Sequence, residues 1–370
     1  MAKKHLREGF TTGSAAAAGA KAGIFCLAGH DPVNEVDIPL PVGGRLTIPI
    51  SEASANGNSC SVTVIKDAGD DPDVTHKARI KSTVRILPEG AHGHVIIFGG
   101  KGVGKVTRRG LPVPVGKSAI NPVPRRQIKE AVLEGLKETG ITAAVSVTIE
   151  VENGEKIAKK TLNPRLGIIG GISILGTRGT VKPFSNKAYT ATITLSMDVA
   201  RAAGLSTIAL TTGGKSERFL KEKRPELPEI SFIQVADFFS FSLKEAVKRE
   251  FADILYSCFF GKLVKMAQGY PYTHARKSRI DFSQLSGWCV SMGMDEEKAE
   301  KIPNANTARE VLSIIMEESQ KDKIIYHIME KAISSARRFA VPLPNITYYL
   351  FDFEGNVLAS KNAKGVSHSM

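Results

Sequence analysis

The fold class is decided by three consecutive segments: STIALTTGGKSERFLKEK (206–223), ISFIQVADFFSFSLKEAVKREF (230–251) and ILYSCFFGKLVKMA (254–267). Each segment opens with an apolar run of strand length and continues with residues at helical spacing. Strands that alternate with helices through short loops predict a parallel, doubly wound sheet. Ligands of such sheets bind outside the carboxyl ends of the strands, where Gly213 and Gly214 fall.

The flanking sequence has a different character. Upstream, short β-like runs accompany two helical segments, 11–28 and 124–139, which is typical of an α+β domain. Downstream, residues 281–340 have mostly helical spacing, and two apolar runs joined by Glu-Gly-Asn predict a closing hairpin. We therefore predict an α+β domain over 1–162. An α/β domain, Rossmann-like with a mostly parallel sheet and a helical C-terminal extension, is predicted over 163–370.

Composition argues against membrane and secreted classes. The 370 residues are 42% hydrophobic, yet no apolar run is long enough to span a bilayer, and no apolar stretch of a signal peptide follows the basic start. A cytoplasmic protein without membrane association is expected. The four cysteines are far apart and form no CxxC pair, so we expect buried thiols.

Positive charge is concentrated in three glycine-bearing stretches. Residues 101–130, 156–187 and 261–280 carry +7, +7 and +5, whereas the whole chain carries +13. Such clustering indicates an anionic partner, either a nucleic acid or a polyanionic small molecule. An RNA-binding module remains an alternative, but residues 101–130 contain no aromatic side chain on which a base could stack.

A phosphate-binding loop of a kinase is a second alternative. Gly99–Val106 nearly fits the G-x-x-x-x-G-K-[ST] pattern, but Val106 stands where a hydroxyl should hold magnesium, and a proline-rich stretch follows instead of a helix. Residues 212–216 end in Gly-Lys-Ser, yet Ala209 replaces the first glycine. Both segments depart from the motif.

Two further segments are candidate ligand sites. The glycine-rich stretch 167–179 could bring its backbone close to a ligand, although a tight strand with a bulge explains the pattern equally well. The turn 66–73 holds four carboxylates, which could orient hydroxyls or a cation, or could form a solvated turn. The scattered histidines show no zinc spacing.

Taken together, the motifs resemble the CbiD family of cobalt-precorrin-5B C1-methyltransferases, in order over about residues 5–360. Three departures stand out: Ser14-Ala15 replaces a common Thr-Cys, Arg178 adds a cation to the glycine stretch, and residues 275–279 are unusually basic. The matching segments are LREGFTTGSAAAAGAKA (6–22), VIKDAGDDPDVT (64–75), GVGKVTRRGLPVPVGKSAINPVPR (102–125), NPRLGIIGGISILGTRGTVKPFS (163–185) and GKLVKMAQGYPYTH (261–274).

The resemblance implies an enzyme of vitamin B12 (cobalamin) biosynthesis that methylates C1 of cobalt-precorrin-5B with S-adenosylmethionine as co-substrate. The substrate is a tetrapyrrole with many carboxylates, which suits the basic stretches. Cobalt would arrive only inside it, so no protein metal site is expected. A homodimer is one open alternative for the assembly, and no nucleic acid is expected.

We assign candidate residues to three roles on this basis. Asp67, Asp70 and Asp71 are the candidate catalytic carboxylates. The expected cofactor site comprises Gly167, Gly170, Gly171, Gly176, Thr177, Gly179, Gly213 and Gly214. The expected substrate site comprises Thr11, Thr12, Gly13, Ser14, Lys105, Asn121, Arg125, Arg165 and His274.

Overall fold

A computed structural model describes residues 6–30, 33–88 and 90–365 of the protein. The chain forms two compact units, residues 1–186 and 187–370. Both contain sheets and helices, which confirms the expected mixed α/β class. The division lies after Asn186 rather than after residue 162, because strands in the segment 163–181 pair with strands of the first unit.

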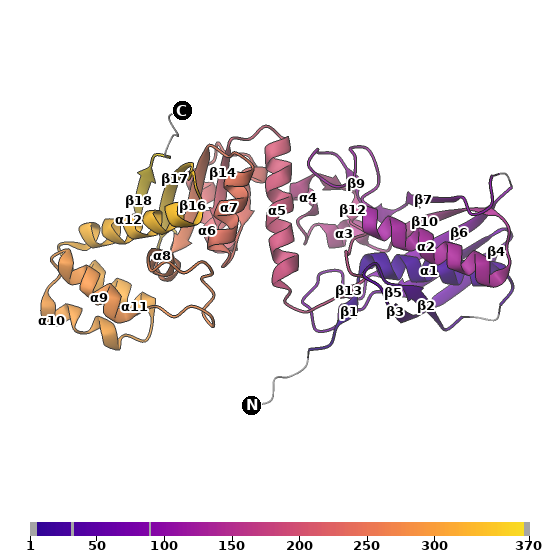
Figure 1. The fold of residues 1–370 in the computed structure, drawn as a ribbon, viewed down its shortest axis with the longest axis horizontal. Helices are drawn as coiled ribbons and strands as arrows, with labels where there is room; N and C mark the ends of the chain where they lie inside the picture. Colours follow the sequence, from indigo (N-terminus) through magenta and orange to yellow (C-terminus); the bar gives the residue numbers. More distant parts are fainter. Residues whose placement is uncertain (1–5, 31–32, 89, 366–370) are drawn as a thin grey trace. The chain divides into compact units, whose positions relative to one another are not determined.

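A five-stranded sheet forms the centre of the first unit, with two helices lying side by side over one face (Figure 1). The sheet is antiparallel except where β7 runs parallel to β10. Its strands, in spatial order, are β4 (Glu52–Asn56), β5 (Ser59–Ile65), β6 (Arg79–Leu87), β10 (Ala144–Val151) and β7 (Val95–Gly99), and the helices are α1 (Thr12–Leu27) and α2 (Pro122–Thr139).

Small residues allow α1 to lie close to the sheet. Its alanines from Ala15 to Ala18 are fully buried. A Cβ at Gly23 would lie 2.7 Å from the Val84 side chain, and Ser82 donates a hydrogen bond to the Ala16 carbonyl at 3.0 Å. The alanine-rich segment is therefore a packing surface, since larger side chains would force the helix away from the sheet.

The rest of the first unit is built from short pairings. β1 pairs with β13, β9 with β11, and β8 with β12, and β2 and β3 form a hairpin. The bounds are β1 (Gly9–Phe10), β2 (Glu35–Pro39), β3 (Arg45–Pro49), β8 (Gly102–Val103), β9 (Lys105–Val106), α3 (Gly154–Ala158), α4 (Asn163–Leu166), β11 (Ile168–Ile169), β12 (Gly171–Ile172) and β13 (Thr180–Val181).

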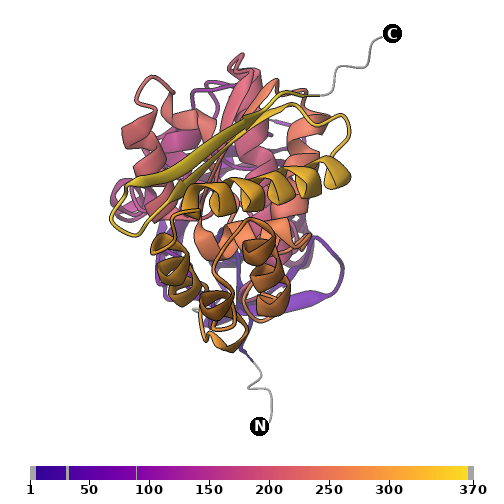
Figure 2. The ribbon, with the colours of Figure 1, turned by 90° about the vertical axis from the view of Figure 1, so that its left-hand side faces the viewer.

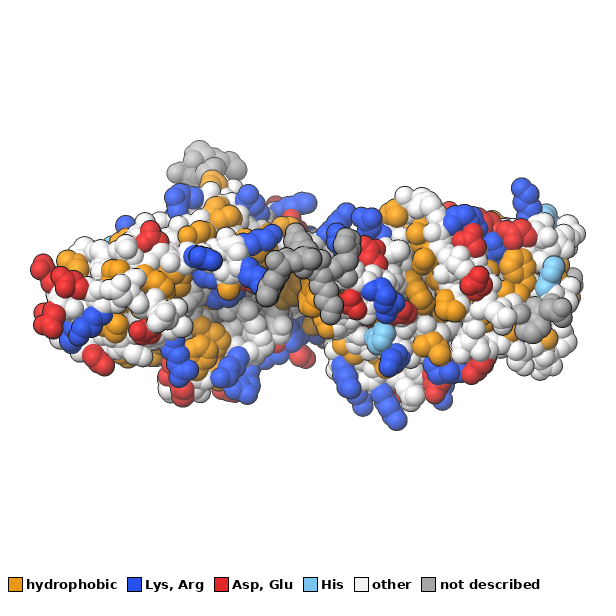
Figure 3. Space-filling view, turned by 90° about the horizontal axis from the view of Figure 1, so that it is seen from below, with side chains coloured by type: hydrophobic (Ala, Val, Ile, Leu, Met, Phe, Trp, Pro, Cys, Tyr) orange, Lys and Arg blue, Asp and Glu red, His pale blue; other side chains and the backbone are white. Residues whose placement is uncertain are grey.

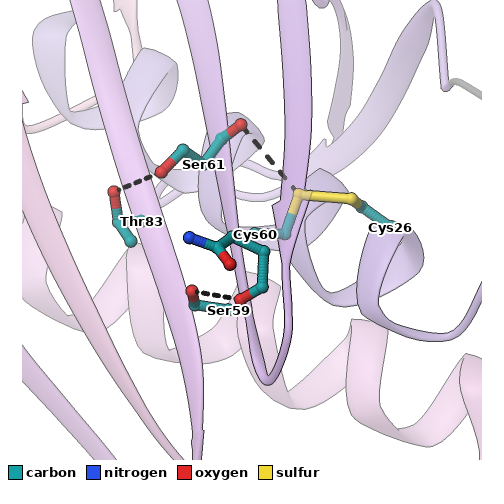
Figure 4. The surroundings of a disulfide bond; sticks show 6 residues. Cys26, Ser59, Cys60, Ser61 and Thr83 are labelled. Carbon is teal, nitrogen blue, oxygen red and sulfur yellow. Dashed lines mark hydrogen bonds between the residues drawn. A yellow bond between two sulfur atoms is a disulfide. The ribbon is translucent and has the colours of Figure 1, made fainter.

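The cysteines depart in part from the expectation of buried thiols. Cys26 at the end of α1 and Cys60 in β5 form a disulfide, which ties the helix to the sheet beneath it (Figure 4). Cys258 and Cys289 are free and buried, as expected. The prediction of a thiol is therefore wrong for Cys26 and Cys60, because the fold brings together two cysteines that are distant in sequence.

The second unit contains a five-stranded sheet in the order β15-β14-β16-β17-β18. The first four strands are parallel, and β18 returns antiparallel to β17 through the predicted hairpin. Apolar side chains cover both faces, as a parallel sheet requires. The strands are β14 (Thr207–Thr211), β15 (Phe232–Gln234), β16 (Asp253–Phe259), β17 (Asn345–Phe351) and β18 (Val357–Ala363).

Helices surround this sheet (Figure 2). α12 crosses one face and packs against α7 and α8, with the smaller helices α9 to α11 beside it. The bounds are α5 (Asn186–Ala202), α6 (Gly214–Lys223), α7 (Phe239–Lys248), α8 (Phe260–Ala267), α9 (Phe282–Ser291), α10 (Glu296–Ala299), α11 (Ala308–Met316), α12 (Lys321–Phe339) and two 3₁₀ turns, Glu229–Ser231 and Ile302–Asn304.

Candidate active site

The expected substrate residues Thr11 to Ser14 lie at the first turn of α1. The Thr11 side chain caps the helix by accepting from the Ser14 amide at 3.1 Å. The Thr12 hydroxyl accepts from the Leu175 amide at 2.9 Å, and the Ser14 hydroxyl donates to the Gly179 carbonyl at 2.7 Å. This turn is therefore bound to the glycine stretch 167–179, which places two of the predicted segments together.

Within that stretch, most glycines face other protein atoms. A Cβ on Gly171 would lie 2.1 Å from the Gly102 carbonyl oxygen, and one on Gly176 would lie 2.5 Å from the Thr11 side chain. The space that a Cβ would need at Gly167 and at Gly179 is likewise occupied, by the side chains of Arg108 and Leu40 respectively. These glycines permit close approach of chain segments to one another, which is a packing role. Gly170 alone of these faces open space.

The aspartate turn packs against the segment that leads into α1. Arg7 forms an ion pair with Asp67, and the Arg7 amide donates to Asp70 at 2.8 Å. The hydrogen bond from Arg7 lowers the pKa of Asp67 to about 2. Asp71 accepts from the Phe184 amide at 2.9 Å. All three predicted carboxylates thus hold backbone or side chains of the first unit.

The remaining predicted residues of the first unit differ in environment. Lys105 is exposed in β9, whereas the half-buried Arg125 donates to the Ile97 carbonyl at 3.0 Å. Burial lowers the pKa of the Arg125 guanidinium. The backbone amide of Asn121 donates to the Ile174 carbonyl at 3.0 Å. Arg165 lies in α4, just before Gly167. Asn121 therefore adjoins the glycine stretch.

The second unit holds Gly213 and Gly214 at the carboxyl edge of its parallel sheet. The chain leaves β14 toward β15 on one side and later returns to β16 on the other, so the direction of strand addition reverses between β14 and β16. Open α/β sheets bind ligands at this kind of reversal. A Cβ on Gly213 would meet nothing within 4 Å, and one on Gly214 would meet only the Gln234 amide at 3.9 Å. The backbone here faces open space.

A polar cluster beside this turn was missed in the sequence prediction. Asp237 follows β15 and forms an ion pair with Lys262 of α8, while Thr273 donates to the same Asp237 oxygen at 3.2 Å. Thr273 is fully buried. The signal in the sequence was an acidic residue directly after the second strand of the β/α alternation, a position that often contacts a ribose.

Aromatic side chains line the same side of the second unit. Tyr189 stacks on Phe238, and Tyr272 stacks on His274 with ring centroids 5.9 Å apart. Burial, followed by the charge of Asp237, raises the pKa of Tyr189. His274 thus belongs to an aromatic group whose loop continues into the exposed cations 276, 277 and 279.

The phosphate-loop alternative finds little support. Residues 107–121, which follow the Gly99–Val106 pattern, form bends, turns and isolated bridges instead of a helix. Gly214 does begin α6, but the Lys215 ammonium donates to the Phe353 carbonyl at 3.0 Å, so it is engaged by the protein. On the face drawn in Figure 3, basic and acidic side chains are interspersed over the first unit.

Two features are missing from the described residues. Within ranges 6–30, 33–88 and 90–365, no three His, Cys, Asp or Glu side chains are grouped to hold a metal ion. Over the same residues, no helix combines the length and apolar character that a membrane crossing needs.

Comparison with known proteins decides the family. Residues 1–183 match the CbiD family model, and residues 272–362 match the model of the CbiD C-terminal domain. A cobalt-precorrin-5B C(1)-methyltransferase from Nitratidesulfovibrio vulgaris is 46% identical over 96% of this chain and 92% of its own length. The chain belongs to the CbiD family. The resemblance drawn from the sequence is thereby confirmed.

Other relatives of this CbiD chain carry the same name. Those from Geobacillus sp. (strain WCH70) and Leptospira borgpetersenii are 45% and 42% identical, and the matches cover 91% and 97% of this chain and 91% and 96% of theirs. A crystal structure of a cobalamin biosynthesis protein (CbiD) from Archaeoglobus fulgidus is 30% identical, covers 70% of this chain and 78% of its own, and gives a TM-score of 0.39. The predicted enzyme class, a methyltransferase, is confirmed.

Proposed function

We propose that this CbiD protein transfers a methyl group from S-adenosylmethionine to C1 of cobalt-precorrin-5B, which yields cobalt-precorrin-6A in the anaerobic route to cobalamin. Its relatives' shared name supports the reaction. One observation supports the donor site: the Gly213–Gly214 turn faces open space where the strand order of the second unit reverses. We interpret this unit as the Rossmann-like domain expected from the sequence.

The residues at this edge are chemically suited to the methyl donor. Gly213 has no side chain between the backbone and a ligand, and α6 begins at Gly214 with amides that no side chain caps. Amides at a helix start favour a carboxylate such as that of the methionyl group. When bound, the donor supplies an activated methyl on a positively charged sulfur. The glycines of 167–179 are weaker candidates for the donor site, because protein atoms occupy the space beside most of them.

The protein's own part in the reaction is positioning. The donor is already activated, so the enzyme needs to hold the ring carbon in line with the methyl group and to exclude water. The S–CH₃ bond breaks as the C1–CH₃ bond forms, and the sulfonium charge is neutralised. A site shielded from water favours that loss of charge. No covalent nucleophile of the protein is required.

We assign the tetrapyrrole's carboxylates to the basic and polar residues of the predicted substrate site. Lys105 is exposed, whereas Thr11 to Ser14 are buried and their hydroxyls bind other parts of the first unit, so these four residues shape the region beside Asn121 instead of offering free groups. His274 of the second unit, whose loop continues into exposed cations, is a separate candidate contact for such carboxylates. Arginine and lysine would pair with acetate and propionate groups, and cobalt would enter only within the substrate.

Among the carboxylates, Asp71 is the best candidate to relay a proton from the ring. Asp67 is paired with Arg7, whereas Asp71 accepts only a backbone amide among the described residues. Asp71→Ala is expected to lower kcat without changing affinity for the donor. An unchanged kcat would remove the carboxylate role.

Calorimetric titration tests the proposal. The protein is titrated with S-adenosylhomocysteine and, in parallel, with ATP and magnesium. Micromolar binding of the former alone supports the methyltransferase, whereas binding of ATP alone overturns it. Gly213→Val should abolish binding by filling the open space, while Gly287→Val in α9 is the matched control, because Gly287 also has no neighbour within 4 Å. Should neither ligand bind, the titration is repeated with a stable cobalt corrinoid present.

A further inference from the structure

We propose that Asp237 orients the methyl donor by accepting hydrogen bonds from its ribose hydroxyls, and that Lys262 and Thr273 position this carboxylate. The inference rests on the proposed function, because it assumes that the donor binds at the carboxyl edge of the second unit. It adds a positioning residue and a contact to a defined part of the ligand.

Asp237 lies beside the open glycine turn. β15 and β14 are hydrogen-bonded neighbours, with Gln234 paired to Thr211, and the Val235 amide donates to the Thr211 carbonyl at 2.8 Å. The chains that leave these two strands therefore start next to each other. One leads to Gly213, two residues beyond its strand, and the other leads to Asp237, three residues beyond its own. A ligand lying over the glycines extends naturally toward this carboxylate.

One oxygen of Asp237 is fixed and the other is available. Oδ1 accepts from the Lys262 ammonium and from the Thr273 hydroxyl at 3.2 Å. Lys262 also donates to the Thr273 hydroxyl at 3.2 Å, and the Thr273 amide donates to the Asp237 carbonyl at 3.0 Å. No described residue donates to Oδ2. The side chain is 17% exposed, so this oxygen lies in a sheltered place with an unused acceptor.

The available acceptor suits a neutral donor of hydrogen bonds. A ribose diol presents two adjacent O–H groups, and a carboxylate accepts from such groups through charge-assisted bonds. Because Lys262 balances the charge of Asp237, the proposed contact recognises the ribose diol and not the overall charge of the ligand.

A purely structural role would use the same ion pair. Asp237 and Lys262 connect the loop after β15 to α8, and Thr273 ties in the loop before His274. A structural role predicts that Asp237→Asn lowers stability and weakens every ligand equally. A ribose contact predicts instead that the loss depends on the ribose hydroxyls.

The experiment couples a protein change to a ligand change. Wild-type protein and Asp237→Asn are each titrated with S-adenosylhomocysteine and with its 2′-deoxy and 3′-deoxy analogues. Asp237→Asn should weaken S-adenosylhomocysteine by about 10- to 100-fold, the range expected for hydrogen bonds to a charged group. Removal of a contacted hydroxyl from the ligand should weaken binding to wild-type protein similarly. It should weaken binding to Asp237→Asn only a little, so the losses of affinity from the protein change and from the ligand change are not additive.

Two further variants test whether the loss of binding is specific to Asp237. Glu222→Gln removes an exposed carboxylate from α6 and should bind like wild type. Thr273→Val preserves side-chain shape but frees Asp237 partly, so it should weaken binding by less than Asp237→Asn and retain the dependence on the hydroxyls. Unfolding followed by the fluorescence of Trp288, the single tryptophan, checks that each variant is folded.

The outcomes separate the two proposals. If wild-type protein binds S-adenosylhomocysteine and the losses with both analogues are additive, the ribose contact is wrong while the donor site stands. Unchanged affinity of Asp237→Asn has the same meaning. If wild-type protein does not bind S-adenosylhomocysteine even with the corrinoid present, the donor site is wrong, and this inference is wrong with it.

Discussion

Glycine-rich turns of the two units differ in what surrounds them. In the first unit, Gly171 and Gly176 face protein atoms so closely that an added Cβ would lie within 2.1 and 2.5 Å of them. In the second unit, Gly213 has no neighbour within 4 Å of that position. The former glycines let chain segments touch, and the latter leaves room for a ligand. Glycine density alone therefore does not identify a ligand site.

The units also differ in how they are held together. Short strand pairings, ion pairs and a disulfide join the segments of the first unit. A parallel sheet with apolar side chains on both faces stabilises the second. Trp288 lies in the second unit, so its fluorescence reports that unit, whereas circular dichroism reports both. Four predictions use this difference, from the largest expected effect to the smallest.

Loss of the disulfide should destabilise the first unit most. The bond closes a loop between residues separated by 34 positions, and the chain-entropy model gives about 4 kcal/mol for a loop of this size. Cys26→Ser should lower the midpoint of the unfolding transition that circular dichroism follows. The midpoint of the transition that Trp288 fluorescence follows should stay unchanged. Reductant should add nothing to the variant while reproducing its effect in wild type. An equal shift of both transitions would show that the units unfold together.

The paired substitutions Gly171→Ala and Gly213→Ala test the glycine comparison directly. Gly171→Ala should lower the free energy of unfolding of the first unit by about 3 kcal/mol, because its Cβ would overlap the Gly102 carbonyl. Gly213→Ala should change stability by less than about 0.5 kcal/mol, as expected where nothing is displaced. Urea unfolding by dichroism measures both. Equal effects of the two substitutions would remove the distinction.

Tyr348→Phe should leave the second unit as stable as before or stabilise it by about 1 kcal/mol. The Tyr348 hydroxyl is buried and has no hydrogen-bond partner among the described residues, so its removal relieves the cost of desolvation. Thermal unfolding followed by Trp288 fluorescence measures the change. A loss of more than about 1 kcal/mol would show that the hydroxyl is satisfied, for instance by a buried water.

Acid should remove the contribution of the Arg7–Asp67 pair. The pKa of Asp67 is lowered from its ordinary 3.8 to about 2, so the folded protein favours the ionised form. The contribution is present above pH 4 and is lost as pH falls through about 2. Since both side chains are partly exposed, it should be below about 1 kcal/mol. The stability difference between wild type and Asp67→Asn should shrink between pH 4 and 2. A constant difference would contradict the pairing.

Much of the second unit was predictable because its structure is local in sequence. Each of the segments predicted as a strand followed by a helix, 206–223, 230–251 and 254–267, does contain a strand and then a helix. The family was equally predictable, because residues 1–183, which hold long motifs such as NPRLGIIGGISILGT, match the CbiD family model. The sites assigned to individual residues stay predictions, since no bound ligand or variant tests them.

Contacts between distant segments decided the rest. Strands β11 and β12 lie within the α/β domain predicted over 163–370, yet they pair with β9 and β8 of the first unit, because hydrogen bonding to distant partners satisfies their backbone. The Cys26–Cys60 bond and the Asp237–Lys262–Thr273 cluster arise in the same way. The sequence by itself determined periodicity, charge and family. Only the tertiary structure decided which glycines are filled by protein and which carboxylate has a free oxygen, because both depend on neighbours far along the chain.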